Sequence, residues 1–148
     1  MLKAAVHLLC IRDGQILLAR RYNTGYEDGN YSVPAGHLDG AETVRAAATR
    51  EAREEVGVSI AEDDLEFGHV MHRQGDEERI DFFFVTRAWT GEPRIAEADR
   101  CDELRWAEPT RLPTNTIPYV AEGIRLTLRG QAFSEFGWSV QELSDGAV

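Results

Sequence analysis

The residue types best suited to chemistry in this sequence are carboxylates, and Glu51, Glu54 and Glu55 follow closely after Arg50. In a helix, residues three and four apart share a face, so these carboxylates would lie together. Carboxylates that close repel one another unless a cation neutralises them. Oxygen ligands of this kind suit hard cations such as Mg²⁺ or Mn²⁺. The spacing therefore points to a divalent metal site on one helix face.

A plainer interpretation of the same helix is also open, because charged helix faces are usually just solvated. Arg50 and Glu54 are spaced as an ordinary i,i+4 ion pair. One turn earlier, Val44, Ala47 and Ala48 give the same face an apolar start, and a buried stripe normally stays apolar along a helix. On the helix alone the solvated interpretation is favoured, and the segment before the helix changes the balance.

That segment is a turn-rich loop, Pro34-Ala35-Gly36 followed by Asp39-Gly40-Ala41-Glu42. Loop and helix together, residues 36–58, resemble the Nudix box: Gly, five residues, Glu, seven residues, Arg-Glu-hydrophobic-any-Glu-Glu-any-Gly-hydrophobic. The positions that match are Gly36, Glu42, Arg50, Glu51, Glu54, Glu55, Gly57 and Val58. Ala52 fills the first hydrophobic position with a small side chain, a mild departure. On this match the chain is similar to the Nudix hydrolases, and to their MutT-like members in particular.

The resemblance implies hydrolysis of a diphosphate linkage in a nucleoside diphosphate joined to another group. It implies Mg²⁺ as the cofactor, with Mn²⁺ as a substitute. The implied metal ligands are the carbonyl of Ala35 and the carboxylates of Glu51, Glu54, Glu55 and Glu97. Glu54 is the first candidate for the general base and Glu97 is the second.

Four box residues have supporting roles in this interpretation. Arg50 would orient Glu51 or Glu54 within the acidic cluster. Glu42 would complement the positive end of the helix and fix the loop. Gly36 would permit close backbone approach, and Gly57 would end the helix.

Residues outside the box carry weaker matches to MutT-like proteins. Glu97 follows the turn Gly91-Glu92-Pro93 by four residues, as a metal-binding Glu does in those relatives. The acidic neighbours of Glu97 that could take its place are Asp99, Asp102 and Glu103.

The same resemblance implies three substrate-binding residues, Arg21, Arg79 and Asn115. An Arg fork suits phosphate oxygens, and an Asn amide offers both a donor and an acceptor to a base edge. Plainer roles stay open, because Arg21 could be solvated at a strand end and Asn115 could cap the following helix.

The substrate is indicated less directly than the reaction. The region Arg73-Gln74-Gly75-Asp76 lacks the Pro and Tyr that mark ADP-ribose and diadenosine polyphosphate hydrolases. A nucleoside triphosphate is favoured, either an oxidised guanine nucleotide or a pyrimidine one, cleaved to the monophosphate and pyrophosphate. The alternatives are a hydrolase of nucleotide sugars or dinucleotides and a non-catalytic Nudix-fold ligand sensor. Such sensors usually lose box carboxylates, and none is missing here.

Composition narrows the partners and the location. The 148 residues are expected to form one domain, residues 1–148. The net charge of −10 argues against a nucleic-acid polymer as partner, since that would need a basic patch. We expect a small nucleotide as partner and no membrane, because the first residues are too soon interrupted by charge for a span or a signal peptide. Two cysteines make no disulfide framework, which suits a cytoplasmic protein.

Hydrophobic patterning predicts an α/β chain. Strands are expected over residues 3–12, 15–21, 31–33, 65–73, 79–89 and 104–106, and a second helix over 117–129. Asp13-Gly14 is a hairpin signal, and Gly130 is a suitable residue after the second helix. The resemblance implies the Nudix fold, a mixed β-sheet sandwiched between α-helices.

Several other residues carry expectations. His69 and His72 lack a third soft ligand for zinc, and are expected on a pocket wall or at the surface. Asp81 could point into the same cleft as Arg79. The tail aromatics Phe133, Phe136 and Trp138 should dock on the body of the protein or on a partner subunit, which leaves a homodimer open. Residues 144–148 are expected to be frayed.

Overall fold

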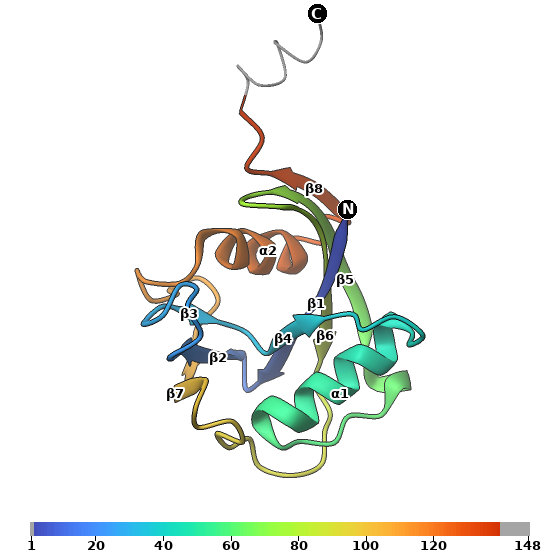
Figure 1. The fold of residues 1–148 in the computed structure, drawn as a ribbon. Helices are drawn as coiled ribbons and strands as arrows, with labels where there is room; N and C mark the ends of the chain where they lie inside the picture. Colours follow the sequence, from blue (N-terminus) through green and yellow to red (C-terminus); the bar gives the residue numbers. More distant parts are fainter. Residues whose placement is uncertain (1, 140–148) are drawn as a thin grey trace, which may run out of the picture.

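The computed structural model describes residues 2–139, which form a mixed β-sheet with two helices and a short 3₁₀ turn (Figure 1). The expected fraying of residues 144–148 falls outside this range. In chain order the elements are β1 (Lys3–Arg12), β2 (Gln15–Arg21), β3 (Tyr31–Ser32), β4 (Ala35–His37), α1 (Val44–Val56), η1 (Glu62–Asp64), β5 (Glu66–Gln74), β6 (Glu78–Thr86), β7 (Cys101–Ala107), α2 (Pro118–Leu128) and β8 (Phe133–Phe136).

Strand β1 organises the sheet, because it pairs with three other strands. Most of it runs parallel to β6, starting with Lys3 beside Arg79. Its other edge pairs antiparallel with the short strand β4, and its last residues pair with β2. Strands β5 and β8 continue the sheet beyond β6, while β3 and β7 flank β2. The sheet therefore mixes parallel and antiparallel pairings, as predicted.

The two helices cover opposite faces of the sheet. Successive side chains of a strand point to opposite faces, so neighbouring residues pack against different helices. In β1, Leu8 packs in the cluster beneath α1, whereas Leu9 packs in the cluster beneath α2. In β6, Phe84 and Phe83 divide between the two clusters in the same way. The predicted layering is confirmed, and it explains why β6 carries a continuous apolar run.

Helix α1 is bounded by two local signals. Thr43 Oγ1 accepts a hydrogen bond from the Ala46 amide at 3.0 Å and so caps the N-terminus. Gly57 has a φ of 69°, a left-handed conformation that ends the helix. The buried face consists of Ala47, Ala48, Ala52 and Val56. The small residue at position 52 is thus a core residue.

Helix α2 starts with a proline and approaches the sheet closely. Pro118 occupies the first turn, where its missing N–H is not needed. A Cβ at Gly123 would overlap with the Phe83 ring, so the helix axis depends on glycine there. Gly130 has a φ of 77°, as expected for a residue after a helix end.

Three strand predictions are corrected. Residues 35 and 36, expected to form a turn, belong to β4, and no local sequence pattern predicts the pairing of β4 with β1. Strand β6 ends at Thr86 and not at residue 89, because Thr86 Oγ1 donates to the Ala88 carbonyl in a tight turn. Strand β7 begins at Cys101 and not at residue 104, because its pairing with β2 extends as far as Arg21.

Strand β8 was not expected, and it changes the interpretation of His69. It runs parallel to β5 along the far edge of the sheet. The His69 ring is fully buried: Nδ1 donates to the Gln131 carbonyl at 2.6 Å, and Nε2 accepts from Ser134 Oγ at 2.7 Å. The prediction that His69 lies on a pocket wall or at the surface is therefore wrong. Among the tail aromatics, Trp138 donates to the His72 carbonyl, whereas Phe133 stays 53% exposed.

Two features of composition also have structural outcomes. Cys10 is buried in β1, and Cys101 is half-buried; both are free thiols. Within residues 2–139, neither helix has the length and apolar character needed to cross a bilayer.

Candidate active site

The acidic face of α1 packs against a glycine of β4. The Glu51 carboxylate lies so close to Gly36 that a Cβ at that position would overlap with it. Gly36 cannot move away, because β4 is paired to β1 with Gly36 beside Val6. The Glu51 side chain is only 12% exposed, and burial raises its pKa. Gly36 is thus required by close approach and not by its φ.

The guanidinium of Arg50 joins the box loop to the acidic face. It donates two hydrogen bonds to Glu42, at 2.7 and 3.1 Å. It also donates to Glu51 at 2.9 Å and to Glu54 at 3.2 Å, which makes the expected i,i+4 pair. Glu42 in turn accepts from the Asp39 amide, and the Arg50 bond lowers the pKa of Glu42. The loop and the carboxylates are therefore held by one side chain.

Glu55 faces the sheet one turn beyond Glu51. Its carboxylate accepts a hydrogen bond from the Ala35 amide at 2.8 Å. Desolvation raises the pKa of Glu55 well above its usual range, and the charges of Glu51 and Glu97 raise it further. Three carboxylates from the helix and a distant loop therefore act on one another.

The loop that carries Glu97 is fastened to the end of α1. The Arg94 amide donates to the Val56 carbonyl at 3.0 Å, and the Ala96 amide donates to the Glu55 carbonyl at 3.1 Å. These bonds satisfy helix carbonyls that have no partner within the helix. They also explain why Glu97, far from the box in sequence, lies near Glu55.

A pocket opens between α1, the end of β2 and this loop. Glu55 and Glu97 line it together with Arg21, and the structure adds Arg100 and Cys101, which sequence reasoning missed. Both additions sit just after Glu97, in a segment without hydrophobic period, so only the pairing of β7 with β2 brings them to the pocket. The pocket thus combines carboxylates and guanidinium groups at one opening.

The donor chemistry fits a hard divalent cation. Mutual repulsion between Glu51, Glu55 and Glu97 is what a divalent cation would relieve. As the side chains stand, no three His, Cys, Asp or Glu residues within 2–139 are grouped closely enough to form a metal site. Arg50 holds Glu51 and Glu54, and the Ala35 amide holds Glu55. A cation there requires these carboxylates to turn toward one another.

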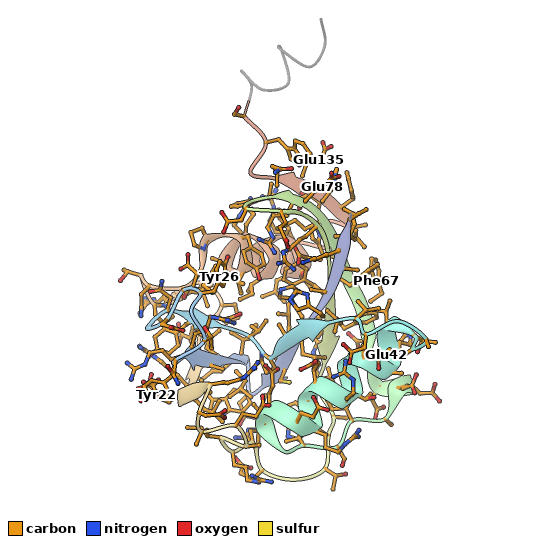
Figure 2. All side chains as sticks on the ribbon, in the orientation of Figure 1. Tyr22, Tyr26, Glu42, Phe67, Glu78 and Glu135 are labelled. Carbon is orange, nitrogen blue, oxygen red and sulfur yellow. The ribbon has the colours of Figure 1, made fainter. Side chains whose placement is uncertain are left out.

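Each predicted substrate-binding residue is bonded to other parts of the protein, and Arg21 and Asn115 both bond to Gly29. Arg21 lines the pocket, but its guanidinium is bonded to the Tyr26 carbonyl and Thr24 Oγ1. Arg79 lies at the start of β6, where it contacts His37 Nδ1 at 3.2 Å and pairs with Glu77. Figure 2 shows Tyr26, whose carbonyl accepts from Arg21, on the opposite side of the molecule from Glu42 of the box loop.

Asn115 lies beside the loop after β2, where its amide donates to the Gly29 carbonyl at 2.9 Å. The alternative that Asn115 caps α2 is wrong, because the N-cap is Ile117 and no side chain bonds there. Glu103, a competitor of Glu97, accepts a hydrogen bond from the Tyr31 hydroxyl.

A buried polar cluster lies between the sheet and α2. The expectation that Asp81 points into the cleft is wrong: it is fully buried and accepts from Arg73 Nε at 2.7 Å. The Arg73 guanidinium stacks over the Tyr119 ring at 3.7 Å, and the Tyr119 hydroxyl contacts His7 Nε2 at 3.1 Å. His7 Nδ1 is buried with no hydrogen-bond partner within residues 2–139. Burial lowers the pKa of His7 to about 4.

Comparison with known proteins agrees with this geometry. The family model for the NUDIX domain matches residues 1–127. The chain is 30% identical over 104 residues to "Putative 8-oxo-dGTP diphosphatase" of Bacillus subtilis (strain 168), a match that covers 70% of this chain and 64% of the Bacillus protein. It is 28% identical over 91 residues to "8-oxo-dGTP diphosphatase" of Proteus vulgaris, covering 62% of this chain and 80% of that protein.

Solved structures give the same result. A MutT NUDIX hydrolase from Burkholderia pseudomallei superposes with a TM-score of 0.79 at 26% identity, covering 85% of this chain and 98% of that one. The E. coli ORF135 protein, at 20% identity, shares the fold with a TM-score of 0.73, covering 86% of this chain and 89% of that one. With the family model spanning most of the chain and α1 bearing the full set of box carboxylates, the protein belongs to the Nudix hydrolase family and resembles its MutT-like members.

Proposed function

We propose that the protein is a Mg²⁺-dependent pyrophosphohydrolase that cleaves a nucleoside triphosphate to the monophosphate and pyrophosphate. The observation that supports it is the acidic surroundings of Glu55, where burial and the charges of Glu51 and Glu97 raise the pKa of Glu55 beside a pocket lined with arginines. A site of that charge favours a divalent cation together with an anionic phosphate chain.

The residues proposed to hold the cation are the Ala35 carbonyl and the carboxylates of Glu51, Glu54, Glu55 and Glu97. When bound, Mg²⁺ neutralises phosphate charge and lowers the pKa of a coordinated water. Arg50 would keep the box loop in place through Glu42 while the other carboxylates turn to the cation. Gly36 leaves the space that the Glu51 carboxylate needs.

The general base is one of two carboxylates with different surroundings. Glu54, the first candidate, is 49% exposed and is oriented by Arg50. Glu97, the second, lines the pocket beside Glu55. A base must reach the proton that it removes, directly or through one water. Loss of the base lowers kcat without weakening substrate binding in proportion. We therefore expect the larger fall in kcat, at similar KM, in whichever of Glu54→Gln and Glu97→Gln removes the base.

The substrate proposed first is an oxidised guanine nucleotide, on the strength of the names of the Bacillus and Proteus relatives. Arg21, Arg79 and Asn115 are proposed to contact it, and Arg21 is the member of this set that lines the pocket. We further propose that the protein acts in the cytoplasm on small nucleotides.

The test is a panel of nucleotides incubated with Mg²⁺, with the products identified. The panel contains normal and oxidised nucleoside triphosphates, nucleotide sugars and dinucleotides. We expect monophosphate and pyrophosphate from a triphosphate, loss of activity with EDTA, and recovery with Mg²⁺ or Mn²⁺. Faster cleavage of nucleotide sugars or dinucleotides would replace the triphosphate proposal. Tight binding without turnover would indicate a sensor, and turnover that survives EDTA would contradict the metal-dependent mechanism.

A further inference from the structure

Three arginines line the candidate pocket, and two of them are already engaged by the protein. Arg20 donates to Asp102 through two nitrogens, at 2.7 and 3.1 Å. The guanidinium of Arg21 donates to the Tyr26 carbonyl at 2.6 Å and to Thr24 Oγ1 at 3.0 Å. Each of these two cations therefore has acceptors before any ligand arrives.

The third arginine, Arg100, is different. Its guanidinium makes no hydrogen bond and no ion pair with any residue of the described range 2–139. It is exposed, although Glu55 and Glu97 line the same pocket. An arginine at a site with carboxylates usually pairs with one of them, since such pairs are charge-assisted hydrogen bonds. Here the cation is left available to a ligand.

The backbone of Arg100 is nevertheless fixed on both sides. Its amide donates to the Glu97 carbonyl at 2.9 Å, and its carbonyl accepts from the Tyr22 amide at 2.9 Å. The next residue, Cys101, begins β7 beside Arg21. The Arg100 side chain therefore extends from a fixed backbone position between the acidic loop and the end of β2.

We propose that Arg100 binds the diphosphate group of the substrate; this inference rests on the proposed function. A phosphate chain that enters this pocket meets Glu55 and Glu97, whose charge opposes it even when part of that charge is offset by a cation. A guanidinium fork matches phosphate oxygens in two parallel hydrogen bonds. Arg100 supplies this contact with no partner among residues 2–139 to displace, whereas Arg20 and Arg21 would first have to leave theirs.

The kinetic test uses Arg100→Ala and Arg100→Lys, with Arg111→Ala as the matched control. The Arg111 side chain is 85% exposed and lies 3.9 Å from Glu108, so its removal should change nothing. We expect Arg100→Ala to lower kcat/KM for the best triphosphate by about 10- to 100-fold, mainly through KM, as for loss of a charged hydrogen bond. Arg100→Lys, with charge but no fork, should fall between. Tm should stay at the wild-type value, because the Arg100 side chain makes no bond to the part of the chain that the structure describes.

The binding test needs no turnover, because it follows Mg²⁺ with inorganic tripolyphosphate by calorimetry. We expect Arg100→Ala to raise Kd about 10-fold or more and Arg111→Ala to leave it unchanged. Equal kcat/KM and equal Kd in Arg100→Ala and wild type would overturn the role of Arg100 and leave the hydrolase intact. If wild type cleaves no nucleotide, the proposed function fails, and the tripolyphosphate Kd alone decides the role of Arg100. If wild type neither cleaves nor binds, both proposals fail.

Discussion

At the scale of the residue, Glu55 opposes the stability of the fold that contains it. Its raised pKa means that the folded state disfavours the charged carboxylate, whereas the unfolded chain carries it freely at neutral pH. Residues with this conflict are typical of functional sites, because a purely structural position would be filled by a neutral side chain.

We expect Glu55→Gln to lower turnover by at least 100-fold, with Tm unchanged or higher. The amide keeps an oxygen for the Ala35 N–H but brings no charge to a cation or to Glu51. Initial rates with Mg²⁺ and thermal unfolding measure the two effects. The control is Glu62→Gln in η1, an exposed carboxylate outside the site. Near-wild-type turnover in Glu55→Gln would remove Glu55 from the metal site.

His7 makes stability depend on pH in a defined direction. Its pKa is about 4 in the folded protein against 6.5 ordinarily, so between these values the unfolded chain binds a proton that the folded chain does not. The His7 contribution to stability is therefore complete above pH 6.5 and is lost as the pH falls toward 4. The His7 contribution lost between pH 7 and pH 5 should be about 2 kcal/mol. The titratable and charged groups that act on the ring are Asp81, Arg73, Tyr119 and His37.

Urea unfolding of wild type and His7→Gln at pH 7 and pH 5 measures this contribution. Glutamine can still bond to Tyr119 but does not titrate. The drop in unfolding free energy should be larger in wild type than in His7→Gln, whatever the variant's stability at pH 7. Equal drops in the two proteins would show that His7 is not the group responsible.

Single residues differ in how far sequence could place them. The box residues of α1 were predicted on one helix because local spacing determines which face they share, whereas Gly36 lies in strand β4 and not in a turn. The predictions for His69 and Asp81 were wrong, because the sequence does not show whether a polar strand residue has a hydrogen-bond partner in the protein interior. Arg100 was missed because its position depends on the pairing of β7 with β2, which sequence spacing does not encode.

At the scale of the element, the contact between β4 and α1 leaves no room for a Cβ at Gly36. Gly36 is held by pairing to β1, and Glu51 is held by the helix, so neither backbone can yield independently. An added methyl group must displace the Glu51 carboxylate from its place over the strand.

We expect Gly36→Ala to reduce turnover at least 10-fold and to destabilise by about 1 to 3 kcal/mol, the range for overpacking. The matched control is Gly75→Ala in the β5–β6 turn. A Cβ there would meet only Arg73 Nη1 at 3.5 Å, an ordinary contact. Rates and urea unfolding of both variants are the measurements. If the two variants behave alike, the contact between Gly36 and Glu51 does not limit the site.

Elements with strong local signals were predicted and those without were not. The Asp13-Gly14 hairpin was found because both residues favour the positive φ that they adopt, 53° and 75°. Helix α1 was found from its spacing and its glycine end. Strands β4 and β8 are too short to show alternation, and each exists because a distant strand offers a free edge. Such elements are determined by tertiary pairing.

At the scale of the whole molecule, β8 lies beyond the residues that the family model matches. The family match ends at residue 127, before β8 begins, and Figure 1 shows β8 at the opposite end of the sheet from α1. Its attachment to β5 includes the hydrogen bond between His69 and Ser134, and His69 also bonds to Gln131 just before β8. We therefore expect β8 to open independently of the site.

Ser134→Ala tests this independence. It leaves His69 Nε2 buried without its partner, which should destabilise β8 by about 1 to 3 kcal/mol. Hydrogen exchange of the β8 amides should quicken, while exchange in α1 and nucleotide turnover stay at wild-type levels. Ser59→Ala, at an exposed position, is the control. A matching rise in exchange across α1 would show that the sheet opens as one unit.

The parallel pairing of β1 with β6 also governs how the chain is made. Lys3 leaves the ribosome well before its partner Arg79 has been synthesised. Until then the apolar β1 segment, which contains Leu8 and Leu9, has an open edge without its main neighbour. Exposed strand edges of this kind attract other nascent chains, and late long-range pairing slows folding. Strand β1, which organises the finished sheet, is thus a segment exposed to aggregation with other chains during synthesis.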